Sequence, residues 1–158
     1  MNFILPYNNI DKNNFSFIKP VKNRTIDNGL FYKLYYNNNL FIINTFMMNI
    51  DLEYMNDKLV KNTINLQILK TIKDIENYLF KKIINMNLKY KTNKKLKYIT
   101  DNILDNKEKI KKRNNSNKKT YLSFDNNEYI KKKRLIIKIN GIWEDNLSYG
   151  FSYNIMEI

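Results

Sequence analysis

The chain of 158 residues contains no cysteine and no histidine. Without thiols it forms neither disulfides nor cysteine-ligated zinc sites, and without imidazole it cannot use Cys–His or Ser–His–Asp catalysis. Carboxylates, lysines, tyrosines and hydroxyls are the groups that remain for hydrolytic or metal-dependent chemistry. These absences therefore exclude several common classes of enzyme.

Alanine is also absent, and glycine (three), proline (two) and arginine (three) are scarce beside 29 asparagines and 25 lysines. Because alanine, glycine, proline and arginine have GC-rich codons, this composition indicates an AT-rich genome. The bias lowers the weight of any single asparagine or lysine. The three glycines lie far apart in the sequence, so the chain has no glycine-rich phosphate loop.

Basic residues outnumber acidic ones by 28 to 15, which gives a net charge of +13. A field of this sign attracts polyanions, and lysine contacts to phosphates are the usual source of non-specific affinity for nucleic acid. An anionic membrane, an acidic protein or a plain solvated surface are the alternatives. The most basic segment, residues 89–119, holds twelve basic and three acidic residues, and we expect a mobile loop there.

The length suits one domain, here residues 1–158, with a core that needs no disulfides. No segment reaches the ~18 consecutive apolar residues of a membrane-spanning helix. The first residues lack the basic leader and the long apolar run of a signal peptide. We therefore expect a soluble, intracellular protein with no membrane insertion.

Apolar residues recur every three or four positions over residues 63–88, which predicts one long amphipathic helix. Asn62 or Thr63 would cap its start. A short helical piece is predicted at 99–110. Strands are predicted at 15–18, 30–36, 40–52 (with a bend that would divide it), 121–124, 135–139 and in a hairpin after a turn at 144–146.

Strands on both sides of one main helix indicate an α+β fold with an antiparallel sheet. The same order is typical of a small, five-stranded OB-like barrel, a fold that commonly binds single strands. The sequence leaves both architectures open.

The alternation of residues 30–36 places Phe31, Lys33 and Tyr35 on one face of their strand. Since an unpaired lysine is rarely buried, this face should meet solvent. Bases stack on aromatic rings while ammonium groups contact phosphates, and Phe41 of the neighbouring strand would join this face. The alternative is that the N-terminal segment or another subunit covers the aromatic residues.

A second basic group precedes and enters the strand at 135–139. Its lysines stay solvated unless a polyanion neutralises them. Trp143 should continue the apolar face of Leu135, as core or at a barrel rim. The predicted nucleic-acid-binding residues are Phe31, Lys33, Tyr35, Phe41, Lys131, Lys132, Lys133, Arg134 and Lys138.

The acidic residues do not indicate a site. Asp51, Glu53 and Asp57 lie close in sequence, as do Glu144 and Asp145, but their spacing is that of ordinary turn and loop acids. We expect no catalytic residues, no metal, no cofactor and no enzymatic activity. A carboxylate-dependent nuclease is the least favoured alternative.

The stretch Ile137–Glu144, followed by Tyr149–Tyr153, resembles the C-terminal end of small uncharacterised proteins of large nucleocytoplasmic DNA viruses. The hairpin that begins at Tyr32 resembles them less closely. The resemblance implies a viral gene product that works in replication, transcription or the virion, located in the host cytoplasm, the host nucleus or the virion. No functional residue is established for that group, so none is carried over.

The sequence therefore predicts a non-catalytic protein that binds nucleic acid, prefers single strands of DNA or RNA and tolerates many sequences. The alternative is a structural or assembly protein, such as a minor virion component or a subunit of a larger complex. A homo-oligomer is compatible with either function.

Overall fold

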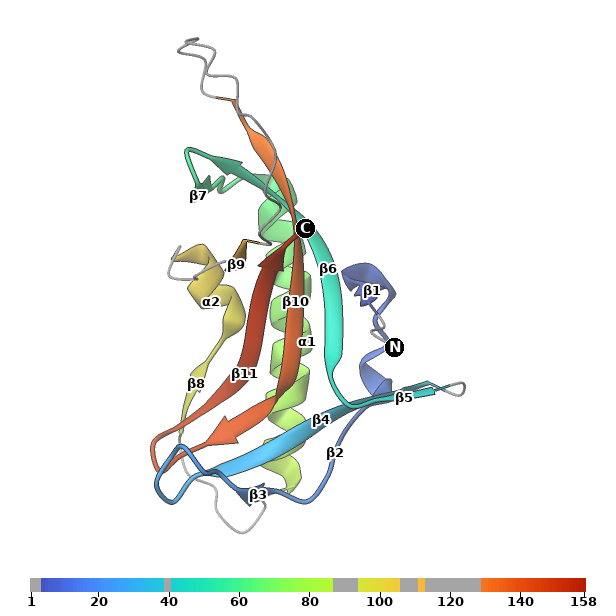
Figure 1. Cartoon of the computed structure of the whole chain (residues 1–158), viewed down its shortest axis with the longest axis vertical. Helices are drawn as coiled ribbons and strands as arrows, with labels where there is room; N and C mark the ends of the chain where they lie inside the picture. Colours follow the sequence, from blue (N-terminus) through green and yellow to red (C-terminus); the bar gives the residue numbers. More distant parts are fainter. Residues whose placement is uncertain (1–3, 39–40, 87–93, 106–110, 113–128) are drawn as a thin grey trace.

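A computed structural model describes residues 4–38, 41–86, 94–105, 111–112 and 129–158 (Figure 1). The fold is α+β, as predicted, with eleven strands in one strongly bent sheet and one long helix. The sheet is open, so the OB-like barrel is not confirmed. The predicted strand at 121–124 lies outside the described residues.

Four strands, β4, β6, β10 and β11, have nine or more residues, and the other seven described strands have two or three each. Residues 40–52 divide into two strands, as the predicted bend requires. The elements are β1 (Ile4–Pro6), β2 (Phe15–Phe17), β3 (Val21–Lys22), β4 (Leu30–Asn38), β5 (Phe41–Ile43), β6 (Phe46–Met55), β7 (Lys58–Leu59), α1 (Thr63–Met86), β8 (Lys95–Lys97), α2 (Ile99–Leu104), β9 (Lys111–Lys112), β10 (Lys131–Glu144) and β11 (Ser148–Glu157), with 3-10 turns at Tyr7–Asn9 and Lys12–Asn14.

Strand β10 is the centre of the sheet. One edge of β10 pairs with antiparallel β11 through residues 135–144. The other edge pairs first with β6, through residues 131–139, and then with β4, through residues 141–144. Strand β4 also pairs with β2, β3 and β5. The sheet therefore bends at the point where β10 changes its partner from β6 to β4.

The register shifts between Ile139 and Gly141, where Asn140 forms a bulge. A bulge reverses the alternation of side chains beyond it. Ile139 and Ile142 are therefore both fully buried on the same face, and Trp143 lies on the opposite face, half-buried. The prediction that Trp143 continues the apolar face of Leu135 is wrong, because it assumed an unbroken period of two.

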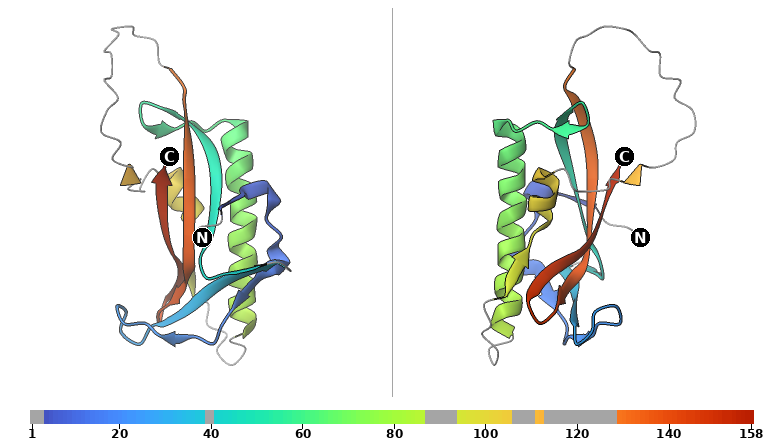
Figure 2. Two further views of the ribbon diagram at one scale, coloured as in Figure 1. Left: turned by 45° about the vertical axis from the view of Figure 1, so that its right-hand side comes forward. Right: turned by 90° about the vertical axis from the view of Figure 1, so that its left-hand side faces the viewer.

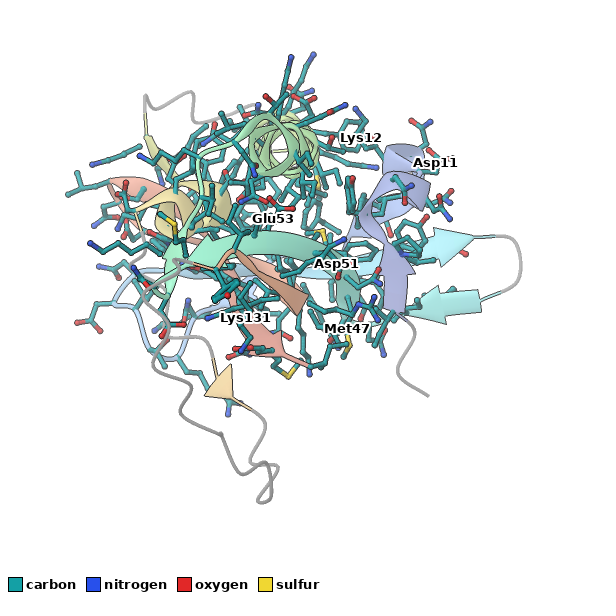
Figure 3. All side chains as sticks on the ribbon, turned by 90° about the horizontal axis from the view of Figure 1, so that it is seen from above. Asp11, Lys12, Met47, Asp51, Glu53 and Lys131 are labelled. Atoms are coloured by element: carbon teal, nitrogen blue, oxygen red, sulfur yellow. The ribbon has the colours of Figure 1, made fainter. Side chains whose placement is uncertain are left out.

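Helix α1 covers one face of the sheet, here called the inner face (Figure 2). Figure 3 shows the helix end-on above this face, with Asp11 and Lys12 of the N-terminal segment beside it. The Asn62 side chain accepts a hydrogen bond from the Asn65 N–H (2.9 Å) and caps the helix, as predicted. Ile72, Leu79 and Ile83 are fully buried against the sheet. In the described part of the chain, no helix is both long and apolar enough to cross a membrane.

The segment predicted as a mobile basic loop, 89–119, is described at residues 94–105 and 111–112. There it forms β8, parallel to β11, then α2, and β9, also parallel to β11. Helix α2 starts at Ile99, the first residue of the helical piece predicted at 99–110. The rest of the segment lies outside the described residues.

A buried asparagine joins α1 to the edge of the sheet. Asn65 is fully buried and donates to the carbonyls of Glu53 (2.8 Å) and Val60 (2.7 Å), while its Oδ1 accepts from the Glu53 N–H (3.0 Å). The side chain thus occupies the place of a strand residue beside β6. Buried backbone groups without partners are costly, so this side chain holds together the end of β6, the start of α1 and the residue after β7.

We expect Asn65→Ala to lower the free energy of unfolding by about 2–4 kcal/mol, because it removes the side-chain partner of the Glu53 N–H and of the Val60 carbonyl. The Glu53 carbonyl keeps its hydrogen bond from the Val60 N–H (2.9 Å). Urea unfolding followed by circular dichroism measures the change. Asn85→Ala, at an exposed position of the same helix, is the matched control and should alter stability by less than about 0.5 kcal/mol. Equal effects of the two substitutions would contradict this role for Asn65.

Candidate functional site

The face of the sheet opposite α1 is called the outer face, and no helix of the described residues lies over it (Figure 2). On β4, Phe31, Lys33 and Tyr35 are half-buried on this face, whereas Tyr32 and Leu34 are fully buried beneath it. The predicted alternation of this strand is confirmed. The Lys33 ammonium lies 5.4 Å from the centroid of the Tyr35 ring, so aromatic and cationic groups adjoin one another here.

Two aromatic rings of the outer face lie against glycines of a neighbouring strand. A Cβ atom on Gly141 would lie 2.7 Å from Cζ of Phe31, and one on Gly150 would lie 2.3 Å from Cζ2 of Trp143. Trp143 is paired with Phe31 on one side and with Gly150 on the other. The two residues are therefore paired on adjacent strands, and each ring lies against a glycine whose missing side chain leaves room for it.

These rings form one wall of an open pocket of about 520 Å³, here called the outer-face pocket. Its other walls come from β3 and from the loop between β3 and β4, which lies beside the β10–β11 turn (Figure 1). The lining residues are Val21, Lys22, Asn23, Arg24, Thr25, Ile26, Phe31, Trp143 and Ser152.

The loop that borders the pocket is held by its own hydrogen bonds. Asn23 Oδ1 accepts from the Thr25 N–H (3.0 Å) and hydroxyl (2.8 Å), and the Asn23 N–H donates to the Gly29 carbonyl (2.8 Å). Gly29 is buried, and a Cβ there would lie 2.8 Å from Cβ of Ile26 and 3.0 Å from the Glu144 carbonyl. Each of the three glycines of the chain thus adjoins a residue that lines the outer-face pocket: Gly29 adjoins Ile26, Gly141 adjoins Phe31 and Gly150 adjoins Trp143.

The rim of the pocket is basic. Lys22 and Arg24 are exposed, and among the described residues neither forms an ion pair with a carboxylate. Lys97 of β8 places its ammonium 4.9 Å from the Trp143 ring centroid. Asp27 is the one acidic residue of the bordering loop. The pocket therefore combines aromatic walls with a surplus of positive charge.

The predicted basic residues of β10 are divided between the two faces. Lys138 lies half-buried on the outer face, opposite Leu135, as predicted. Lys132 and Arg134 are exposed on the same face, but both approach Asp51: the Arg134 Nε donates to its Oδ1 (3.0 Å), and the Lys132 Nζ lies 3.9 Å from its Oδ2. Their charge is therefore partly neutralised.

Lys133 lies on the inner face, and the prediction that it belongs to a solvated basic run is wrong. Its side chain is 6% exposed, its Nζ donates to Asp57 Oδ1 (2.7 Å) and lies 4.7 Å from the Tyr54 ring centroid. The alternation of β10 turns it inward, and the β6–β7 turn, in which Asn56 and Asp57 have positive φ angles of 50° and 59°, supplies the carboxylate.

Two further predicted residues lie apart from the pocket. On β5, Ile43 is paired with Tyr36 and Phe41 with Asn38, so the odd positions of β5 are aligned with the inner positions of β4 rather than with Tyr35. The Phe41 side chain is outside the described part of the structure. Lys131 is exposed at the opposite end of β10, where it lines a second open pocket of about 530 Å³.

A buried polar cluster lies behind Trp143, on the inner face. Glu144 accepts hydrogen bonds from the Tyr32 hydroxyl (2.5 Å) and from Lys94 Nζ (2.6 Å), and Lys94 also donates to the Asp145 carbonyl (2.5 Å). The cluster fixes the end of β10 against β4 and the start of β8. The sequence does not predict this cluster, because no local pattern relates Glu144 to a lysine fifty residues away and because Glu144 faces inward only as a result of the bulge.

A second buried carboxylate, Glu76 of α1, joins the two helices. It accepts from the N–H groups of Ile99 (2.5 Å) and Thr100 (3.4 Å) and from the Thr100 hydroxyl (2.7 Å), at the start of α2. Burial raises its pKa from 4.5 to about 6, and these hydrogen bonds and the charge of Lys73 oppose the rise. The hydrogen bonds of Glu76 all go to residues at the start of α2, so the carboxylate links the two helices. Within the described residues, no group of three or more acidic side chains could hold a metal ion.

In comparisons with known proteins, no family model, no curated protein and no solved structure matches the chain.

The raised pKa of Glu76 predicts a pH-dependent stability. Because the folded chain binds this proton more tightly than the unfolded chain, the contribution is fully present below about pH 4.5 and is lost as the pH rises through about 6. We expect a loss of about 2 kcal/mol in the free energy of unfolding over this window. Urea unfolding of Glu76→Gln should show a flatter profile than the parent chain. Asp74→Asn, at an exposed position of the same helix, should keep the parent slope.

Gly150→Ala tests the packing of Trp143. The added methyl group would lie 2.3 Å from the indole, so we expect the ring to move and the free energy of unfolding to fall by about 1–3 kcal/mol. The emission maximum of Trp143, the single tryptophan, reports the movement directly. Asn154→Ala, at an outer position of β11 that does not line the pocket, is the control and should leave both quantities near their parent values. An unshifted emission maximum in Gly150→Ala would contradict the described packing.

Proposed function

We propose that the chain is a non-catalytic nucleic-acid-binding protein that prefers single strands and tolerates many sequences. The observation that carries the proposal is the outer face, where Phe31, Tyr35 and Trp143 are half-buried beside lysines that form no ion pair with any carboxylate of the described residues. Duplex bases are stacked on each other and unavailable to such rings, whereas bases of a single strand can stack on them. The net charge of +13 supports the same class of partner.

In the proposed complex the strand runs across β4 and β10 on the outer face. Phe31 and Tyr35 stack with bases, and Lys33 and Lys138 contact phosphates. Arg134 contributes less, because Asp51 already engages it. Lys133 is not part of this surface. Every base has a π-face, so such binding is sequence-tolerant and depends strongly on salt.

Fluorescence anisotropy with labelled single-stranded and duplex oligonucleotides, across a salt series, tests the proposal. We expect tighter binding of the single strand and an affinity that falls steeply with salt. Tyr35→Ala should weaken binding by roughly 5- to 100-fold, and Lys33→Gln should reduce the slope against log salt by about one. The same mixtures with magnesium reveal any cleavage.

Matched controls lie on α1, away from the outer face. Tyr78→Ala, at a half-buried tyrosine, and Lys70→Gln, at an exposed lysine, should leave affinity and salt slope near the parent values. Absence of binding at low salt, or equal effects of Tyr35→Ala and Tyr78→Ala, would overturn the proposed interface.

Exposed apolar side chains favour a second candidate, a structural or assembly protein. Val21 is 55% exposed, Ile42 66% and Leu147 78%, and packing against another subunit would bury these side chains. Multi-angle light scattering without nucleic acid distinguishes the two. A large, salt-resistant assembly would favour this candidate, and a monomer would favour the nucleic-acid-binding protein.

A further inference from the structure

We infer that the outer-face pocket holds a single nucleotide unit, with its base against Trp143 and Phe31 and its phosphate at Lys22 and Arg24. The inference rests on the proposed function for its ligand class, but it assigns a discrete site. Sequence analysis placed only Phe31 among the binding residues. Trp143, Lys22 and Arg24 enter from the structure.

The size and the lining of the pocket fit this ligand. Its volume of about 520 Å³ lies within the range of roughly 300–1,000 Å³ that is typical of small-ligand sites. Such sites combine apolar and aromatic walls with a few polar groups that fix orientation. Here the apolar walls are Val21, Phe31 and Trp143, and the polar groups are Asn23, Thr25 and Ser152.

The shape of the pocket depends on the three glycines. Three atoms of the Trp143 ring, Cζ2, Cε2 and Cη2, lie within 3.0 Å of the position of a Cβ on Gly150, so the ring lies over the backbone of β11. Gly141 gives the Phe31 ring the same kind of space on β10, and Gly29 brings the bordering loop against Glu144. With only three glycines in 158 residues, their convergence at one pocket separates it from the rest of the surface.

The charge at the rim selects for an anion attached to the planar group. Arg24 and Lys22 line one wall. Lys97 places its ammonium over the indole ring, 4.9 Å from the centroid, so a base that stacks on this face displaces it. The Oδ1 atom of Asn23 already accepts two hydrogen bonds from Thr25. The NH₂ group of Asn23 is therefore the part of this side chain that would donate to a ligand. An aromatic wall for a base and an arginine for a phosphate are the two elements of nucleotide recognition.

The chain provides its own probe, because Trp143 is its single tryptophan. We expect adenosine and uridine 5′-monophosphates to quench its fluorescence in a saturable way, since base stacking brings the ring into contact with the indole. The free nucleosides and inorganic phosphate should each bind at least tenfold more weakly, because each offers one of the two contacts. If none of these ligands, oligonucleotides included, quenches the Trp143 fluorescence in a saturable way, the inference is overturned.

Arg24→Gln tests the phosphate contact without disturbing the core, since Arg24 is exposed. It should weaken the monophosphate by roughly five- to twentyfold and leave the nucleoside unchanged. Lys70→Gln, at an exposed lysine of α1 outside both the pocket and the proposed strand-binding surface, is the charge-matched control and should leave monophosphate binding as it is. Equal effects of the two substitutions would reduce the site to general electrostatic attraction and overturn the inference.

A short oligothymidylate distinguishes a base of a strand from a free nucleotide. Quenching at far lower concentration than with the monophosphate, and weakened by Arg24→Gln, identifies a base of a bound strand. Saturable quenching by the monophosphate alone identifies a free nucleotide, and the proposed strand-binding function then fails while the pocket stands. Anisotropy that reports strand binding unaffected by Arg24→Gln and without any change in Trp143 emission leaves the proposed function intact and rejects the pocket.

Discussion

The bulge at Asn140 is the constraint on which the rest of the sheet depends. It lies where β10 changes partners on one edge, from β6 to β4, and it reverses the faces of all residues that follow. Before it, Ile137 and Ile139 face the helix. After it, Ile142 and Glu144 do so, and Trp143 joins Phe31 on the outer face. Without this extra residue, the tryptophan would be in the core and the buried carboxylate would lie outside it.

The same arrangement explains the positions of the three glycines. In a chain whose composition is biased toward asparagine and lysine, glycine is scarce, and each of the three occupies a position where a Cβ would meet another atom within about 3 Å. Gly141 directly follows the bulge, so its lack of a side chain lets Phe31 pack beside Trp143. The corner of the sheet, the two rings and the pocket are thus consequences of one local irregularity.

The parts of the fold that follow a simple period were predictable from the sequence. The spacing of Ile68, Ile72 and Ile75 is a property of the helix itself, and the alternation of Phe31, Lys33 and Tyr35 needs only a regular strand. The bulge, by contrast, has no local signal beyond a glycine that follows an asparagine, so Trp143 was assigned to the wrong face. Lys133 was misplaced for a related reason: four consecutive basic residues suggest a solvated run, but a strand turns every second one inward, and Asp57, distant in sequence, makes that position tolerable.

The positive charge of the protein is distributed unevenly over the described surface. Most carboxylates that pack on the described sheet and helices are already engaged: Asp51 with Arg134, Asp57 with Lys133, and Glu144 with Lys94. These pairs cancel positive charge at the far end of β10 and inside the protein. Around the outer-face pocket and along β4, the lysines and the arginine form no ion pair with a carboxylate in the part of the chain that the structure describes. Because exposed charges act over only about 8–10 Å at physiological salt, the local surplus rather than the total of +13 decides where a polyanion is held. That surplus coincides with the half-buried aromatic rings, which a surface evolved only for solubility would have no reason to present.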